Sequence, residues 1–257
     1  MTIPLFKSHY SIGKSILTLA PPDADRSPDG PASIFDIAIE NNLSKVVLVE
    51  DSFMGFLEAQ QMSENLGLEF IFGLRFDLCQ DVADTTDSSL AKCSHKVIIF
   101  PKNAAGCKTL NHIYTQCKTK YSGWLDLSIL SSLWKDRHLV LAIPFYDSFI
   151  FKNLTTFNAC IPNFPFTSPT FFLEDNGLPF DPLVAEGVHQ YSAAHDHPTQ
   201  SVHSIYYKNR SDFSAYLAYK LICGRNSFAG RSLSLEKPNF DHMGSKEFCW
   251  ESYLEKI

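Results

Sequence analysis

The chain has 257 residues, of which 45% are hydrophobic and 19% are charged, and its formal net charge is −6. These values predict a globular protein of one large or two small folding units, and they exclude a mainly disordered chain. No apolar stretch reaches the roughly 18 residues of a membrane-spanning helix, so we expect no membrane role. An acidic chain without a block of Lys and Arg is poorly suited to gripping nucleic acid directly, so any role near DNA is expected to pass through a partner.

The cysteines and the N-terminal segment indicate a compartment. Seven cysteines are widely spaced and include no CxxC pair, which argues for reduced thiols and against a disulfide framework or a zinc ribbon. Lys7 and Lys14 interrupt the short apolar runs of the N-terminal segment, which therefore lacks the core of a signal peptide. We expect a cytoplasmic protein.

Strand and helix patterns alternate from the start of the chain. A first strand is expected at 3–7, and Ser33 can cap the helix that follows. The second strand, 45–50, is an unbroken Val/Leu run of the kind that is buried on both faces. A helix is expected over 54–66, with Gly67 as its stop. Its apolar positions are Met54, Leu57, Met62 and Leu66.

The same alternation continues to the C-terminal part. Further strands are expected at 69–76, 96–101, 138–144, 169–173 and 199–207, helices at 103–118, 180–194 and 211–222, and loops at 20–32 and 82–92. About seven strands, most of them followed by a helix, predict a parallel α/β fold. Its simplest form is a barrel with functional groups at the carboxyl ends of the strands.

Two segments resemble ligand sites. Residues 224–232 resemble a phosphate loop, but they have one residue too many between the glycines and Arg231 in place of lysine, so an ordinary loop is the favoured interpretation. The second segment is rich in histidine: His189, His195, Asp196, His197 and His203. If 199–207 is extended, His203 lies about 20 Å from His197, so a solvated turn before this strand is favoured over a metal site.

Glu50 and Asp51 form the most functional-looking position. They end the second strand, where barrels gather carboxylates for metal binding or acid/base work. The alternative interpretation is a polar strand end or a helix cap.

The order of several short motifs resembles the PHP (polymerase and histidinol phosphatase) domain of the bacterial DNA polymerase III alpha subunit. IPLFKSHYS is similar to the family's HLHTHSEYS, and LVED followed by MGFLEAQQMSENLGLEFIFGLRF is similar to its LTDHGN and FGAVEFYKAAKEAGIKPIIGCEV run. KVIIFPKNAAGCKTLNHI and HPTQSVHSIYYKNRSDFSAYLAYKLI match two later segments. The resemblance implies a distorted seven-stranded (β/α) barrel over residues 1–257, in which the last 30 or so residues could lead to a polymerase module.

The resemblance also implies that the metal site is degenerate. Family members with an intact site bind zinc, manganese or magnesium ions through His, Asp and Glu, and only the second motif keeps carboxylates here, as Glu50 and Asp51. The other family positions carry substituted residues: Ile3, Leu5, Lys7, Lys14, Arg75, Ser204 and Tyr206. Ile3 and Leu5 cannot bind a metal, and the three cations would repel one. We therefore expect no cofactor, and our hypothesis is that Lys7, Lys14 or Arg75 pairs with Glu50 and Asp51.

The expected function is structural. The resemblance implies a non-catalytic domain that is either part of a replicative polymerase or a separately encoded piece that accompanies it. This domain would contact the polymerase core or a proofreading exonuclease and reach DNA only through them. The aromatic residues of 145–172 could supply a contact surface, although a buried core is the favoured use for most of them. The alternative is a metal-dependent phosphoesterase or 3′–5′ exonuclease that uses His9, Glu50, Asp51 and His203. A third, less favoured interpretation is a free-standing small-molecule phosphatase, and the loss of the first-motif histidines argues against it as well.

Overall fold

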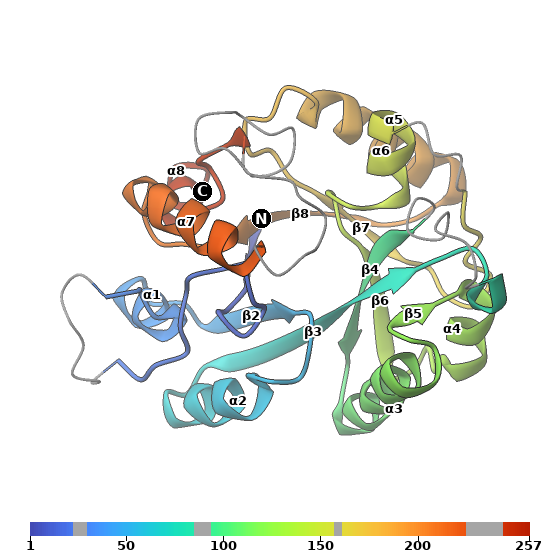
Figure 1. Cartoon of the computed structure of the whole chain (residues 1–257), viewed down its shortest axis with the longest axis horizontal. Coiled ribbons are helices and arrows are strands. Elements are labelled where there is room, and N and C mark those ends of the chain that lie inside the picture. Colours follow the sequence, from blue (N-terminus) through green and yellow to red (C-terminus); the bar gives the residue numbers. More distant parts are fainter. Residues whose placement is uncertain (23–29, 85–93, 157–160, 225–243) are drawn as a thin grey trace. The chain divides into compact units, whose positions relative to one another are not determined.

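The computed structural model describes residues 1–22, 30–84, 94–156, 161–224 and 244–257. Its contacts divide the chain into two compact units. The first unit holds Met1–Phe72, Asp175–Pro179 and Val202–Ile257, and the second holds Gly73–Glu174 and Phe180–Ser201. Strands β3 (Glu69–Leu78) and β8 (Thr199–Ile205) contribute residues to both units. Figure 1 shows the elements in sequence colours.

In the first unit, parallel strands lead to the predicted site residues Lys7, Glu50 and Asp51. β1 (Ile3–Phe6) pairs in parallel with β2 (Lys45–Glu50) and with the end of β8. Its helices are α1 (Ile34–Glu40), α2 (Phe56–Asn65), α7 (Phe213–Gly224) and α8 (Trp250–Glu255), with the short 3-10 helix η2 (Arg210–Asp212) before α7. The predicted cap Ser33 is confirmed, because its hydroxyl accepts from the amide of Phe35 at 3.1 Å.

In the second unit, β4 (His95–Pro101) runs antiparallel to both of its neighbours, β3 and β6 (Leu139–Ile143). β7 (Thr170–Leu173) pairs in parallel with β6 and β8, and β5 (Trp124–Leu125) adds to β3. The other elements of this unit are η1 (Val82–Asp84), α3 (Ala104–Lys120), α4 (Leu127–Leu133), α5 (Phe149–Thr156) and α6 (Asp181–His195).

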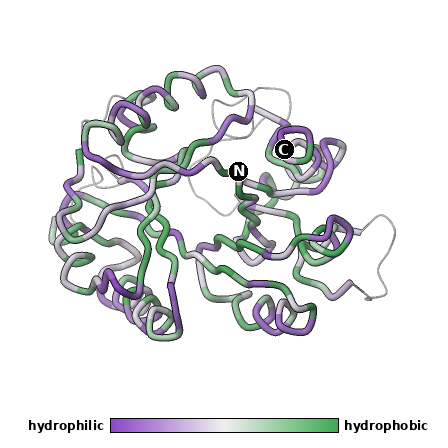
Figure 2. The backbone as a smooth tube through the Cα atoms, turned by 180° about the vertical axis from the view of Figure 1, so that it is seen from behind, coloured by the Kyte–Doolittle hydropathy of each residue, from purple (hydrophilic) through white to green (hydrophobic). Residues whose placement is uncertain are grey.

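The strand pairing supports the barrel part of the prediction. The hydrogen-bonding order is β2-β1-β8-β7-β6-β4-β3, and β3 also pairs with β2, which is the connectivity of a closed seven-stranded barrel. All seven predicted strands are present to within two residues at most ends, and hydrophobic residues concentrate along them (Figure 2). The prediction of a wholly parallel sheet is wrong, because β4 is antiparallel.

Three further segments carry predictions made from the sequence, and the described aromatic residues of 145–172 follow the favoured one. The aromatic residues of 145–172 mostly form core rather than surface: Phe145, Phe149, Phe164, Phe171 and Phe172 are buried. Near the C-terminus, α8 packs its Trp250 against Phe6 of β1, with ring centroids 5.7 Å apart. The first half of the predicted C-terminal linker, up to residue 243, lies outside the described residues. Most of the loop at 224–232 lies outside the described residues.

Candidate functional site

The two carboxylates predicted to be functional lie where β1 and β2 end in the first unit. Glu50 is the last residue of β2, and Asp51 follows it. Lys7 comes directly after β1, which is parallel to β2, so the three side chains reach the same end of the sheet. Lys7 and Glu50 are almost completely buried, whereas the side chain of Asp51 keeps 37% of its exposure.

Glu50 is held by donors from the loop that follows β1. Its Oε1 accepts from the amide of Ser8 at 2.7 Å, and its Oε2 accepts from the hydroxyl of Ser11. Burial raises the pKa of the Glu50 carboxyl above its usual value, and the nearby Lys7 ammonium and the serine donors reduce that rise. Burying an unpartnered carboxylate would cost free energy. The hydrogen bonds from Ser8 and Ser11 offset that cost for Glu50.

Lys7 supplies the positive charge of the cluster. Its Nζ lies 3.4 Å from Oδ1 of Asp51, and its charge also stabilises the ionised form of Glu50. The hypothesis that a side-chain cation pairs with these carboxylates is therefore confirmed for Lys7 and Asp51. Lys14 is exposed instead, and Arg75, in the second unit, forms an ion pair with Asp147 at 3.0 Å.

The loops after β1 and β2 are joined by further polar and packing contacts. The amide of Asp51 donates to Oγ of Ser11 at 3.1 Å. Tyr10 donates from its hydroxyl to Glu58 at 2.6 Å, and its ring lies so close to Gly55 that a Cβ there would come within 2.5 Å of Cδ2 of Tyr10. The glycine at the start of α2 is therefore required by this close approach.

Two of the positions that the resemblance assigns to metal ligands lie opposite one another, because Leu5 of β1 pairs with Ser204 of β8. Ile3 pairs with Val202, which is not one of these positions. Tyr206 stacks on Phe248 with ring centroids 5.5 Å apart. Apolar side chains and an ammonium thus occupy the β1 positions where the resemblance places histidine ligands. This donor set does not fit a cluster of divalent cations, because Lys7 contacts one of the two remaining carboxylates.

The alternative ligand set of His9, Glu50, Asp51 and His203 is not brought together. His203 is opposite Pro4, one residue from the Leu5–Ser204 pair, and neighbouring strand residues point to opposite faces. Its imidazole contacts the carbonyl of Cys249 at 3.2 Å, and burial lowers its pKa to about 4. Among the described residues, no group of three or more His, Cys, Asp or Glu side chains could hold a metal ion.

The histidine-rich segment spans the last part of α6, the short connection after it and part of β8. His195 ends α6, and its ring stacks on Tyr191 at 4.2 Å between centroids. His197 lies 3.1 Å from the hydroxyl of Ser168, and His203 lies inside β8. The predicted turn before the strand is therefore confirmed for His197, whereas His195 is still part of the helix.

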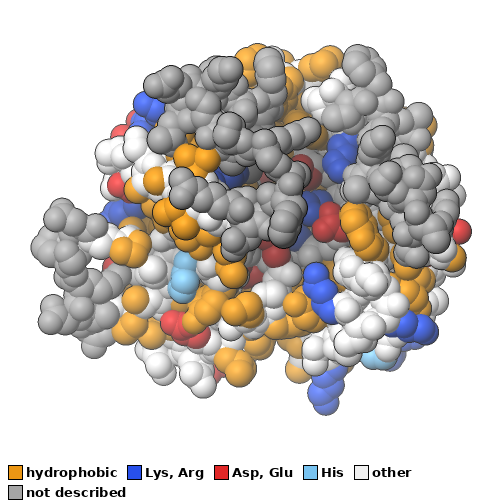
Figure 3. Space-filling model, in the orientation of Figure 1, with side chains coloured by type: hydrophobic (Ala, Val, Ile, Leu, Met, Phe, Trp, Pro, Cys, Tyr) orange, Lys and Arg blue, Asp and Glu red, His pale blue; other side chains and the backbone are white. Residues whose placement is uncertain are grey.

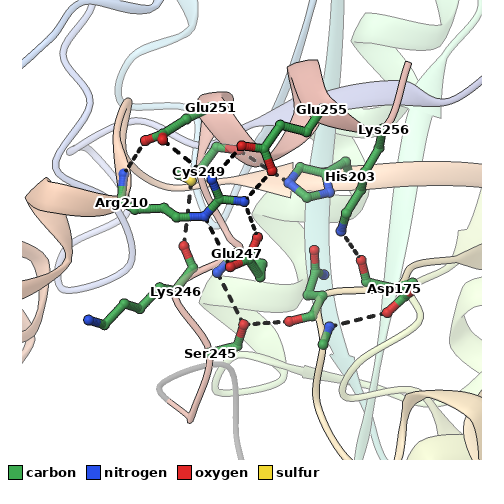
Figure 4. A network of polar contacts seen from close by, with 12 residues as sticks. Asp175, His203, Arg210, Ser245, Lys246, Glu247, Cys249, Glu251, Glu255 and Lys256 are labelled. Atoms are coloured by element: carbon green, nitrogen blue, oxygen red, sulfur yellow. Dashed lines mark hydrogen bonds and ion pairs between the residues drawn. The ribbon is translucent and has the colours of Figure 1, made fainter.

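A second polar network connects elements of the C-terminal part of the first unit (Figure 4). Arg210 donates to three carboxylates that follow one another at intervals of four residues, Glu247, Glu251 and Glu255. Two of these carboxylates come from α8. Arg210 thereby fixes α8 to the 3-10 helix η2, and this role is structural.

The sequence did not identify four loop and helix residues as parts of the candidate site: Ser8, Tyr10, Ser11 and Glu58. Loop residues follow no periodic pattern, so their partners could not be assigned from spacing. The one available signal was position, because the loops at the carboxyl ends of parallel strands build barrel sites.

No protein-family model matches the sequence, and no curated protein matches it either. Among the described residues, no helix combines the length and the apolarity needed to cross a membrane.

Proposed function

We propose that the chain is a PHP-like domain in which internal charges replace the metal centre, and that it serves a replicative DNA polymerase as a structural, partner-binding module. The supporting observation is the cluster at the ends of β1 and β2. Lys7 contacts Asp51 at 3.4 Å, and both carboxylate oxygens of Glu50 accept hydrogen bonds, from Ser8 and Ser11. The partners we propose are the polymerase core or its proofreading exonuclease, and DNA is reached only through them.

Metal content tests the first half of this proposal. The purified full chain is incubated with Mn²⁺ and Zn²⁺, freed of excess metal and measured by mass spectrometry of the elements, and hydrolysis of a model phosphodiester is followed with Mn²⁺. We expect far less than one ion per chain and no hydrolysis. Two or more ions per chain together with hydrolysis would overturn the proposal in favour of a phosphoesterase.

A variant shows whether Lys7 is the reason. Lys7→Met removes the ammonium beside Asp51, so metal uptake should rise, whereas Lys14→Met removes an exposed lysine and should leave uptake unchanged. Capture from an extract of the source organism, with the bound proteins identified by mass spectrometry, tests the partner. Recovery of a replicative polymerase subunit or its exonuclease is expected, and repeated recovery of other proteins alone would contradict this half.

A further inference from the structure

The exposed side of α3, in the second unit, carries lysines and no acidic residue. Lys108, Lys118 and Lys120 are exposed on this helix, and the sequence contains no Asp or Glu between Asp87 and Asp126. Lys, Arg and His side chains are visible around α3 in Figure 3. We define the α3 face as the exposed residues of the helix from Lys108 onward: Lys108, Asn111, His112, Thr115, Lys118, Thr119 and Lys120.

The three ammonium groups of the α3 face keep their charge available to a partner. Among the residues that the structure describes, none of these three lysines forms an ion pair. Nζ of Lys118 lies 5.8 Å from the ring centroid of Tyr114, and Nζ of Lys120 lies 5.3 Å from that of Tyr121. An aromatic ring attracts an ammonium without carrying a countercharge.

Acidic residues of the neighbouring elements have other partners. Asp77 of β3 pairs with Lys96 at 2.6 Å, and Asp126 is 7% exposed and caps α4. Asp136 lies beside Lys102, whose ammonium donates to the Asp136 carbonyl at 2.8 Å, so Lys102 is not counted in the α3 face. These carboxylates therefore do not balance the charge of the α3 face.

The composition of the α3 face limits what can bind it. Its side chains are those of Lys, Asn, His and Thr, so it lacks the hydrophobic centre that is typical of an interface between two folded proteins. Attraction to it must be mainly electrostatic. A long nucleic acid would also meet the rest of a chain whose net charge is −6, whereas a short acidic segment interacts mainly with charges within about 10 Å.

We infer that the α3 face binds an acidic segment of a partner protein. Ten residues separate Lys108 from Lys118, which corresponds to about 15 Å along the helix axis and about 80° around it. An extended segment covers that length with about five residues, so two Asp or Glu residues at this spacing can pair with both lysines. The inference deepens the proposed partner-binding role, on which it rests.

Two labelled polyanions of equal length test the inference without knowledge of the partner. Decaglutamate and a single-stranded decathymidylate oligonucleotide are each titrated with the full chain at low salt and followed by fluorescence anisotropy. We expect decaglutamate to bind more tightly than the oligonucleotide, and its affinity to fall as salt is added. Lys108→Glu should weaken decaglutamate binding about tenfold, and Lys118→Gln should weaken it severalfold.

The matched control lies in the first unit. Lys14 is exposed, and Lys14→Glu changes the net charge of the chain as much as Lys108→Glu does, yet it should leave binding unchanged. Equal weakening by the two variants would overturn the inference, because binding would then follow net charge. Tighter binding of the oligonucleotide, or no binding of decaglutamate at low salt, would also contradict it. Self-association that Lys108→Glu abolishes would overturn it too, since the occupant would then be a second copy of the chain.

Failure of this inference is distinguishable from failure of the proposed function. If Lys108→Glu and Lys118→Gln still capture a replicative polymerase subunit from extract, the partner binds elsewhere, and only the assignment of the α3 face is lost. Binding of metal ions, by contrast, bears on the proposed function and leaves the peptide result untouched.

Discussion

Replacing Lys7 by Met probes the cluster at the ends of β1 and β2. Lys7 is 3% exposed, and removing one partner of a buried ion pair typically destabilises a protein by about 3–5 kcal/mol. Asp51 keeps 37% of its side-chain exposure and can be rehydrated, so we expect a loss of about 2–3 kcal/mol in the free energy of unfolding at pH 7. Urea denaturation followed by tryptophan fluorescence and circular dichroism measures this loss.

The loss should depend on pH in a defined direction. The pKa of Glu50 is raised in the folded state, so the stability linked to its proton is present at low pH and disappears as the pH rises through the folded pKa. Without Lys7 that pKa rises further, so the difference between wild type and Lys7→Met should be larger at pH 8 than at pH 5. Lys14→Met, at an exposed position, should stay within about 0.5 kcal/mol of wild type. A loss for Lys7→Met as small as that of Lys14→Met, or one that grows toward pH 5, would refute this reasoning.

Three further outcomes are expected. Burial lowers the pKa of His95 and of His203 from 6.5 to about 4. The free energy of unfolding should therefore be highest above pH 6.5 and fall below it, by about 2 kcal/mol per histidine at pH 5. Urea titrations at several pH values measure this dependence, and His203→Leu should make it weaker. Arg210→Met should cost about 1–2 kcal/mol by the same measurement, because half-exposed ion pairs contribute little individually, and high salt should reduce the difference. A Cβ at Gly106 would lie 2.3 Å from a backbone oxygen, whereas one at Gly187 would meet only side-chain atoms, at 3.1 Å. Gly106→Ala should therefore lower the melting temperature clearly, and Gly187→Ala should not.

The strands were predictable, but the direction of one was not. KVIIFP in β4 is an apolar run, which indicates burial on both faces and carries no information on direction. A signal was nonetheless present, because 82–92 was expected to be a loop and parallel neighbours need a crossover, usually a helix. The absence of a predicted helix between 76 and 96 should have favoured an antiparallel pair. β5 was missed because two residues form no pattern.

The candidate-site residues at the ends of predicted strands could be identified from the sequence. Lys7, Glu50 and Asp51 follow two strands that the sequence identified, and opposite charges at the same end of a parallel pair are expected to meet. The ion pair of Arg75 with Asp147 could not be foreseen, since Asp147 is 72 residues away in the chain and has a left-handed backbone, with a φ of 64°. Ser8 and Ser11 reach Glu50 only through the fold of their loop.

The packing of α8 on β1 has a consequence for synthesis on the ribosome. The Tyr253 hydroxyl donates to the carbonyl of Thr2 at 3.2 Å, and Trp250 covers Phe6, so β1 is covered by residues that are made after all the described strands. All residues of the second unit, which end at Ser201, precede α7 and α8. The nascent second unit can therefore fold while the first still lacks its closing helices, and a ribosome stalled before Trp250 would hold a chain with Phe6 uncovered.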